Sequence, residues 1–96
     1  MEDGMTRKEF ERLRFAIESE KFRDDFDDPI SYGIQRAAFD CEKFRRLIAA
    51  AQEVNMQTTR VKMEQWKRQL DRAMQSQQRF ERLREEIGGS RVGAAA

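Results

Sequence analysis

The stretch IAAAQEVNMQTTRVKMEQW (residues 48–66) decides the fold of this chain of 96 residues. Apolar residues at helical spacing lead into it and out of it, yet it contains no Gly and no Pro. The chain therefore either folds back here as a helical hairpin or continues as one very long helix.

Two seven-residue repeats meet in this stretch. The first places apolar or small residues at every third or fourth position from Ile30 to Ala51. The second runs from Met56 to Ile87 and is interrupted by the polar Gln77 and Arg84. The repeats are out of phase by one residue, because Asn55 would continue the first and Met56 opens the second. A turn removes this mismatch, whereas a rod must absorb it by local over- or underwinding.

Weak helix formers favour the turn. Five of the positions between 54 and 61 are Val, Asn or Thr, and Thr58 or Thr59 is suited to capping a new helix. The absence of Gly and Pro between residues 34 and 87 favours the rod. We predict the hairpin, with a continuous helix over about 29–87 in an oligomeric coiled coil as the alternative.

The predicted fold is all-α, a three-helix bundle in which the second and third helices form an antiparallel, coiled-coil-like hairpin. Matched helices over about 29–54 and 59–87 suit such a hairpin. The core is thin, because 39% of the residues are charged against about 25% in ordinary domains. We therefore expect one domain over residues 6–87 that oligomerises.

Local signals set the remaining boundaries. Thr6 and Glu9 form the pattern of a capping box, which predicts a first helix over about 7–26 after a disordered segment 1–5. Asp28 before Pro29 predicts the start of the second helix. The glycines at 88 and 89 predict the end of the third helix, followed by a flexible tail over 88–96.

The first helix has two apolar faces on a helical wheel. Phe10, Leu13 and Ile17 fall on one side, and three phenylalanines further along fall almost opposite. A kink near Ser19 would turn both groups toward one core. We favour the other solution, in which two neighbours sandwich this helix, because the sequence around Ser19 has no strong helix breaker.

Charge and targeting signals indicate a soluble intracellular protein. The net charge is +1, divided into −4 over residues 1–28 and +5 over residues 29–96. Binding to nucleic acid is not expected, because such proteins usually carry a clear basic excess. The lone Cys41, the acidic opening MEDGM and the lack of an apolar run of about 20 residues predict a cytoplasmic chain that does not enter membranes.

Catalytic signals are missing from the sequence. It has no His, and Cys41 occupies a position in the first repeat where a small apolar residue packs. The DDFDD run at residues 24–28 lacks the Gly, the spacing and the distal Glu of a calcium loop. We therefore expect no catalytic, metal-binding or cofactor-binding residue, no small-molecule substrate and no enzymatic activity.

Two sets of residues are candidates for binding other chains. Large apolar residues at the double-faced first helix and around the only Trp predict a protein interface, although the interpretation that we favour for Trp66 itself is a bulky core residue with Met packed around it. These interface candidates are Phe15, Phe22, Phe26, Met56, Met63, Trp66 and Met74. The candidates for an electrostatic partner face are Arg68, Arg72, Arg79 and Arg82.

These features predict a protein that acts by assembly. We expect a structural or adaptor subunit that binds protein partners and itself through helices, within a larger machine such as a virion or a secretion apparatus. The alternatives are a small chaperone or regulator with a client groove and a weak nucleic-acid-binding helical protein.

Overall fold

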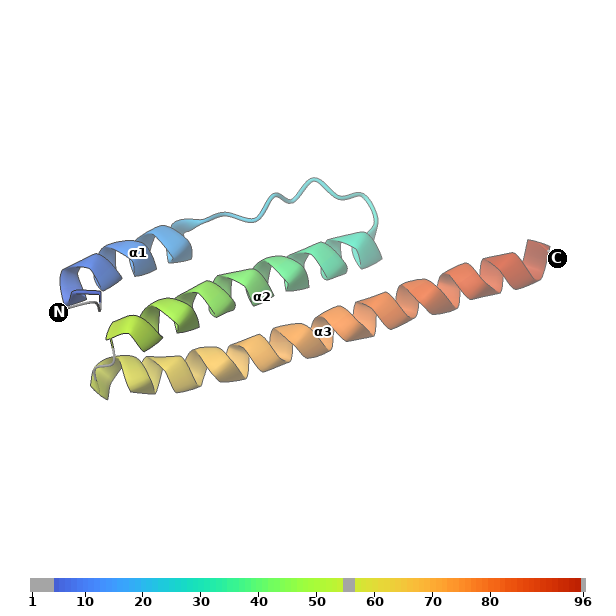
Figure 1. The fold of residues 1–96 in the computed structure, drawn as a ribbon. Coiled ribbons are helices and arrows are strands. Elements are labelled where there is room, and N and C mark those ends of the chain that lie inside the picture. Colours follow the sequence, from blue (N-terminus) through green and yellow to red (C-terminus); the bar gives the residue numbers. More distant parts are fainter. Residues whose placement is uncertain (1–4, 55–56, 96) are drawn as a thin grey trace.

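The computed structural model describes residues 5–54 and 57–95, and these form three helices without a strand. The helices are α1 (Arg7–Ser19), α2 (Pro29–Val54) and α3 (Gln57–Ala95) (Figure 1). The molecule is elongated, with extents of 65 × 23 × 20 Å. None of the described helices is long and apolar enough to cross a lipid bilayer. The all-helical prediction is confirmed.

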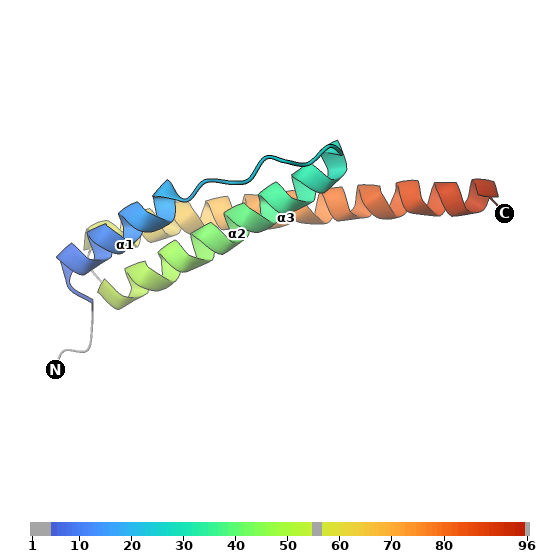
Figure 2. The same cartoon turned by 90° about the horizontal axis from the view of Figure 1, so that it is seen from above.

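The hairpin of α2 and α3 is also confirmed, and the continuous rod is wrong. The two helices run antiparallel side by side over the whole length of α2 (Figures 1 and 2). Ile34, Ala37 and Cys41 of the first repeat are buried between them. Asn55 and Met56, where we predicted the turn, lie outside the described residues. Thr59 does not cap α3, because the helix begins two residues earlier and buries this side chain.

Helix α1 begins where the capping box predicts. The Thr6 hydroxyl accepts a hydrogen bond of 3.1 Å from the Glu9 amide, and the Glu9 carboxylate accepts one of 2.9 Å from the Thr6 amide. Two amides at the helix start that would otherwise lack partners are thereby satisfied. Met5 packs partly buried against the core, so the predicted disordered segment 1–5 is wrong at this residue, and residues 1–4 are outside the described part.

The predicted end of α1 at residue 26 is wrong, because the helix ends at Ser19 and an irregular segment covers residues 20–28. Glu20 pairs with Arg46 of α2 at 2.6 Å, and the Phe22 ring lies 5.5 Å from those of Tyr32 and Phe39. These contacts with α2 stabilise an extended path along it, which local helix propensity does not reveal.

The predicted sandwiching of α1 between two neighbours is not observed in the described residues. The helix packs on the hairpin with one face only, and Phe15 on the opposite face is 74% exposed. Phe10 and Ile17 of the inner face are buried. Because α1 ends at Ser19, Phe22 lies in the segment that follows and packs on α2. Phe22 is therefore partly buried without a second helix packing on α1.

The best packed core lies at the end of the molecule near the turn of the hairpin, where all three helices meet. Its buried residues come from α1, α2 and α3 and exclude water from one continuous cluster. They are Phe10, Ile17, Leu47, Ala50, Ala51 and Trp66.

Helix α2 begins as predicted, because the Asp28 carboxylate accepts hydrogen bonds from the Ser31 amide at 3.0 Å and its hydroxyl at 2.9 Å. The predicted end of α3 at residue 87 is wrong, since the helix continues through both glycines to Ala95. A glycine inside a helix costs only about 1 kcal/mol and no proline follows it. With 39 residues against 26, α3 extends about 20 Å beyond the start of α2 (Figure 1).

Candidate protein interface

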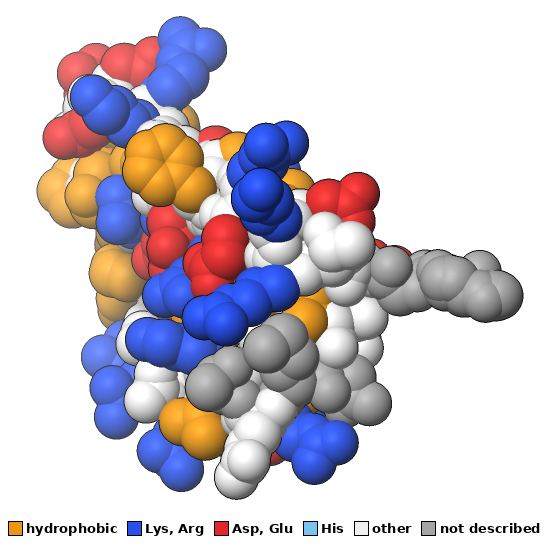
Figure 3. All heavy atoms as spheres, turned by 90° about the vertical axis from the view of Figure 1, so that its left-hand side faces the viewer, with side chains coloured by type: hydrophobic (Ala, Val, Ile, Leu, Met, Phe, Trp, Pro, Cys, Tyr) orange, Lys and Arg blue, Asp and Glu red, His pale blue; other side chains and the backbone are white. Residues whose placement is uncertain are grey.

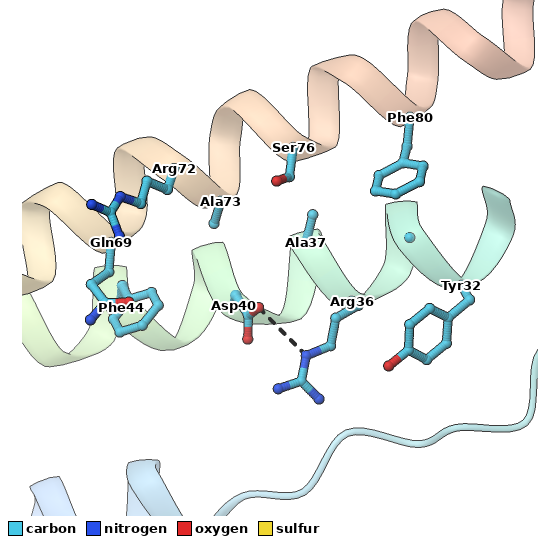
Figure 4. Close-up of a pocket in the computed structure, with 11 residues that line it drawn as sticks. Tyr32, Arg36, Ala37, Asp40, Phe44, Gln69, Arg72, Ala73, Ser76 and Phe80 are labelled. Atoms are coloured by element: carbon cyan, nitrogen blue, oxygen red, sulfur yellow. Dashed lines mark ion pairs between the residues drawn. The ribbon is translucent and has the colours of Figure 1, made fainter. Parts of the chain in front are cut away.

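The hairpin carries an open groove on the side where α1 packs, beyond the point where α1 ends. Helix α1 covers the end near the turn, and the segment that follows it runs along the outer side of α2 (Figures 1 and 2). The groove between α2 and α3 is therefore left uncovered and encloses about 300 Å³. Tyr32, Ala37 and Phe44 line it from α2, and Ala73 and Phe80 line it from α3 (Figure 4).

Gly33 of α2 and Phe80 of α3 approach each other closely in this groove. The Phe80 ring lies where a side chain at Gly33 would begin, since an added Cβ would be 2.6 Å from the ring. Glycine thus allows the ring to lie flat against the α2 backbone. The sequence signal for this contact was a lone Gly inside a helical pattern, which often marks close packing.

Charged side chains flank the groove. Arg36 and Asp40 of α2 form an ion pair of 3.5 Å at its edge (Figure 4). The Arg36 guanidinium also lies 5.3 Å from the centre of the Phe22 ring, within the range of a cation–π contact. Arg72 lines the opposite edge from α3 and is exposed (Figure 4). The groove is thus apolar along its floor and charged along its edges.

An aromatic cluster connects the segment 20–28 to α2. Phe22 lies at its centre, stacked on Phe26 at 6.0 Å and edge-on to Tyr32. Phe22 is half-buried and Phe26 is exposed, so these two predicted interface residues take part in an intramolecular cluster. Tyr32 and Phe39 were not singled out from the sequence, although their spacing of seven residues placed them on one face of α2.

Trp66 lies in the core and not on the surface. It is 6% exposed, its ring lies 6.5 Å from Phe10, and the Arg14 guanidinium lies 5.6 Å from the ring centre. This position agrees with the interpretation of Trp66 as a core residue. Met63 packs partly buried against the same core.

The other predicted interface residues do not join into one surface. Met74 is exposed on α3, Phe15 is exposed on α1, and Met56 lies outside the described residues. Figure 3 shows the end of the molecule near the turn, where Lys, Arg, Asp and Glu side chains are interspersed with separate apolar areas. The end-on face therefore presents neither one large apolar patch nor a single sign of charge.

The four predicted arginines are all exposed on α3. In the described part of the chain, these four side chains form no ion pair; they are Arg68, Arg72, Arg79 and Arg82. Asp71 interrupts their row and accepts a hydrogen bond of 3.0 Å from Gln75. These guanidinium groups are thus available to an acidic or polar partner.

The α3 helix has further exposed apolar residues near the start of α2. Leu83 is 38% exposed and Ile87 is 42% exposed. Leu83 was absent from the second repeat as we read it, because that repeat follows the side of α3 that faces α2. A second apolar row, offset around the helix, was the signal that could have identified it.

Metal-binding and redox chemistry find no support in the described residues. No three or more His, Cys, Asp or Glu side chains within them cluster in a way that could hold a metal ion. Burial raises the pKa of the Cys41 thiol, and its Sγ lies 3.9 Å from Oε1 of Gln77. A raised pKa disfavours the thiolate that a nucleophile requires.

Comparisons of the chain with protein families, with curated proteins and with solved structures find no match.

Proposed function

We propose that this protein is a non-enzymatic structural or adaptor subunit that acts by helix-mediated assembly with protein partners and with itself. The observation that carries this proposal is the incomplete bundle. Three helices close the core near the turn, whereas none of the described residues forms a third helix over the groove between Tyr32 and Phe80. A helix from another chain is the ligand whose shape and apolar face fit such a groove.

The charge distribution supports assembly as well. Four arginines of α3 have no ion-pair partner in the described residues, namely Arg68, Arg72, Arg79 and Arg82, and segment 1–28 of the chain carries a net charge of −4. Such complementary surfaces favour specific orientations of association. A role within a larger machine, such as a virion or a secretion apparatus, and a reducing cytoplasmic setting consistent with a single cysteine are part of the proposal.

The test is the molar mass of the purified chain across concentration. Light scattering coupled to size-exclusion chromatography should show a mass above that of the 11.4 kDa monomer, increasing between low and high micromolar concentrations. A strict monomer throughout this range would contradict self-association.

A chaperone or regulator with a client groove is the second candidate, and the same groove supports it. A monomer that binds amphipathic helical peptides would establish this function instead. Titration of a labelled peptide, compared between the wild type and Ser76→Leu, tests it, because a larger side chain at this half-buried position fills the groove and should weaken client binding.

Binding to nucleic acid is expected to be weak at physiological salt. Neutralising phosphates releases counterions, so any binding through the arginines should fall steeply as salt rises. Tight, salt-sensitive binding to single or double strands that Arg72→Glu abolishes would contradict this expectation. Fluorescence anisotropy with labelled oligonucleotides at several salt concentrations makes the measurement.

A further inference from the structure

On α3, the exposed Leu83 and Ile87 continue a row of residues that begins in the groove with Ser76 and Phe80. Ser76, Phe80, Leu83 and Ile87 follow each other at spacings of four, three and four residues, which places them on one side. Ser76 and Phe80 are half-buried in the groove, whereas Leu83 and Ile87 are exposed. The residues of the row thus become more exposed toward the start of α2.

We propose that a second copy of this chain covers this row, with the two α3 helices packed antiparallel around a two-fold axis near residues 81–83. This inference rests on the proposed function and specifies its interface. In this register Phe80 of each copy faces Leu83 of the other, and Ile87 faces Ser76. The contact is isologous, so it closes as a dimer.

Charge complementarity selects this register. Arg79 and Glu86 flank the apolar row on the same edge, both are exposed, and neither has an ion-pair partner in the described residues. When Phe80 faces Leu83, Arg79 of each copy lies beside Glu86 of the other, which creates two identical ion pairs. Flanking charges of this kind set the orientation of paired helices.

Other registers bring like charges together. A shift by seven residues in one direction places Arg79 beside Arg79, and a shift in the other direction places Glu86 beside Glu86. In a parallel pair, the flanking position five residues further along places Arg79 beside Arg84 and Glu86 beside Arg91, so each attractive pair is offset by a repulsive one. Like charges in these positions are destabilising.

The length of the groove fits the same occupant. From the level of Arg46, where α1 ends, to Pro29, α2 offers 17 residues, or about 26 Å. Residues 76–95 of a second α3 are about 30 Å long as a helix. The end of each α3 that extends beyond its own α2 would lie in the groove of the other copy, in the position that α1 occupies nearer the turn.

Charge reversal tests the register. Arg79→Glu and Glu86→Arg should each weaken the dimer, because each replaces two attractive pairs by two repulsive ones, and we expect the dissociation constant to rise roughly tenfold. The double variant Arg79→Glu/Glu86→Arg restores both pairs and should restore the wild-type constant. Analytical ultracentrifugation measures the constants, and circular dichroism verifies that each variant folds.

Arg68→Glu is the matched control. It makes the same change at an exposed arginine of the same helix, but the proposed register places no charged residue of the second copy beside it, because alanines 94 and 95 lie at its level. Its dissociation constant should stay within about twofold of the wild type.

A cysteine pair tests proximity independently. Two helical residues seven apart are separated by about 10 Å, which is too far for a disulfide, so Arg79→Cys/Glu86→Cys can be bridged only between copies. Under oxidised glutathione this variant should form a covalent dimer on a non-reducing gel. Each single-cysteine variant should not, because residue 79 lies about 10 Å along the axis from residue 79 of the other copy.

The outcomes separate this interface from the proposed function. Restoration by the charge swap together with cross-linking of the double-cysteine variant establishes the interface. A chain that assembles but responds equally to all charge reversals, without cross-linking, overturns this interface and leaves assembly intact. A strict monomer that does not cross-link overturns both the interface and self-association.

Discussion

The two ends of this molecule differ in what covers the hairpin. Near the turn, α1 closes a water-free core around Trp66 and Leu47. At the other end, α2 and α3 continue to pair, but the third position is empty and apolar side chains such as Leu83 remain exposed. The closed end can therefore account for the stability of the single chain. The open end also buries side chains between α2 and α3, such as Ile34 and Cys41, but its groove has the features of a surface for other chains.

The largest expected effect contrasts one substitution at the two ends. Leu47→Ala removes a side chain that is 1% exposed and should lower the free energy of unfolding by about 2–5 kcal/mol. Leu83→Ala makes the same change at the open end and should lower it by less than about 1 kcal/mol in the dilute chain. Urea unfolding at low concentration measures both. Equal losses of unfolding free energy in the two variants would show that Leu83 is packed as tightly as Leu47 in the single chain.

A medium effect is expected where Phe80 lies against Gly33. Gly33→Ala must displace the ring and should destabilise the chain by about 1 kcal/mol, although alanine is the better helix former. In a Phe80→Ala background the obstacle is gone, and the same substitution should stabilise by about 0.5–1 kcal/mol. A double-mutant cycle measured by urea unfolding reports this change of sign. Stabilisation in both backgrounds would contradict the close contact.

A smaller effect is expected at the boundary between the two ends, where Glu20 pairs with Arg46. Both side chains are about 40% exposed, so solvent screens the pair. Glu20→Gln should therefore cost no more than about 0.5 kcal/mol, with less effect at high salt. Thermal unfolding at low and high salt measures it. A loss above 2 kcal/mol would indicate that this pair, and not the packing of Phe22, ends α1.

The smallest effect concerns pH at the start of α1. Hydrogen bonds from the Thr6 amide and hydroxyl lower the pKa of Glu9 below its ordinary value. A carboxylate with a lowered pKa stabilises the fold above its ordinary pKa, and this contribution is lost as pH falls through the lowered value. Glu9→Gln should flatten the response of the Thr6 amide shift in an NMR titration between pH 6 and 2. An unchanged titration would contradict the cap.

The sequence predicted the hairpin because its evidence was distributed over many residues. Two seven-residue repeats, each several turns long, contain much redundant information about which faces are buried. The cap of α1 at Thr6 and that of α2 at Asp28 were also predictable, because each depends on neighbours within three residues. Local chemistry and long periodicity are the two signals that a single sequence carries well.

The positions that depend on distant contacts were not predictable. Helix α1 ends at Ser19, and Phe22 in the segment that follows packs on Phe39 of α2. The residues of α1 contain no signal for this distant contact. The groove is open because α1 ends at Ser19, so the groove could not be predicted from the sequence for the same reason. The sequence favoured a core position for Trp66, but it did not show which residues would cover the ring, because Phe10 reaches it from α1, far along the chain.

The reactivity of the Cys41 thiol can report how often α2 and α3 separate. Its thiol is 1% exposed between α2 and α3, and burial raises its pKa, so a thiol reagent in solution reacts with it only after the two helices separate. When opening is rapid compared with modification, the labelling rate divided by that of an unstructured cysteine equals the fraction of molecules that are open. The native chain can thus be monitored for transient separation of its helices without any substitution, in dilute solution or within an assembly.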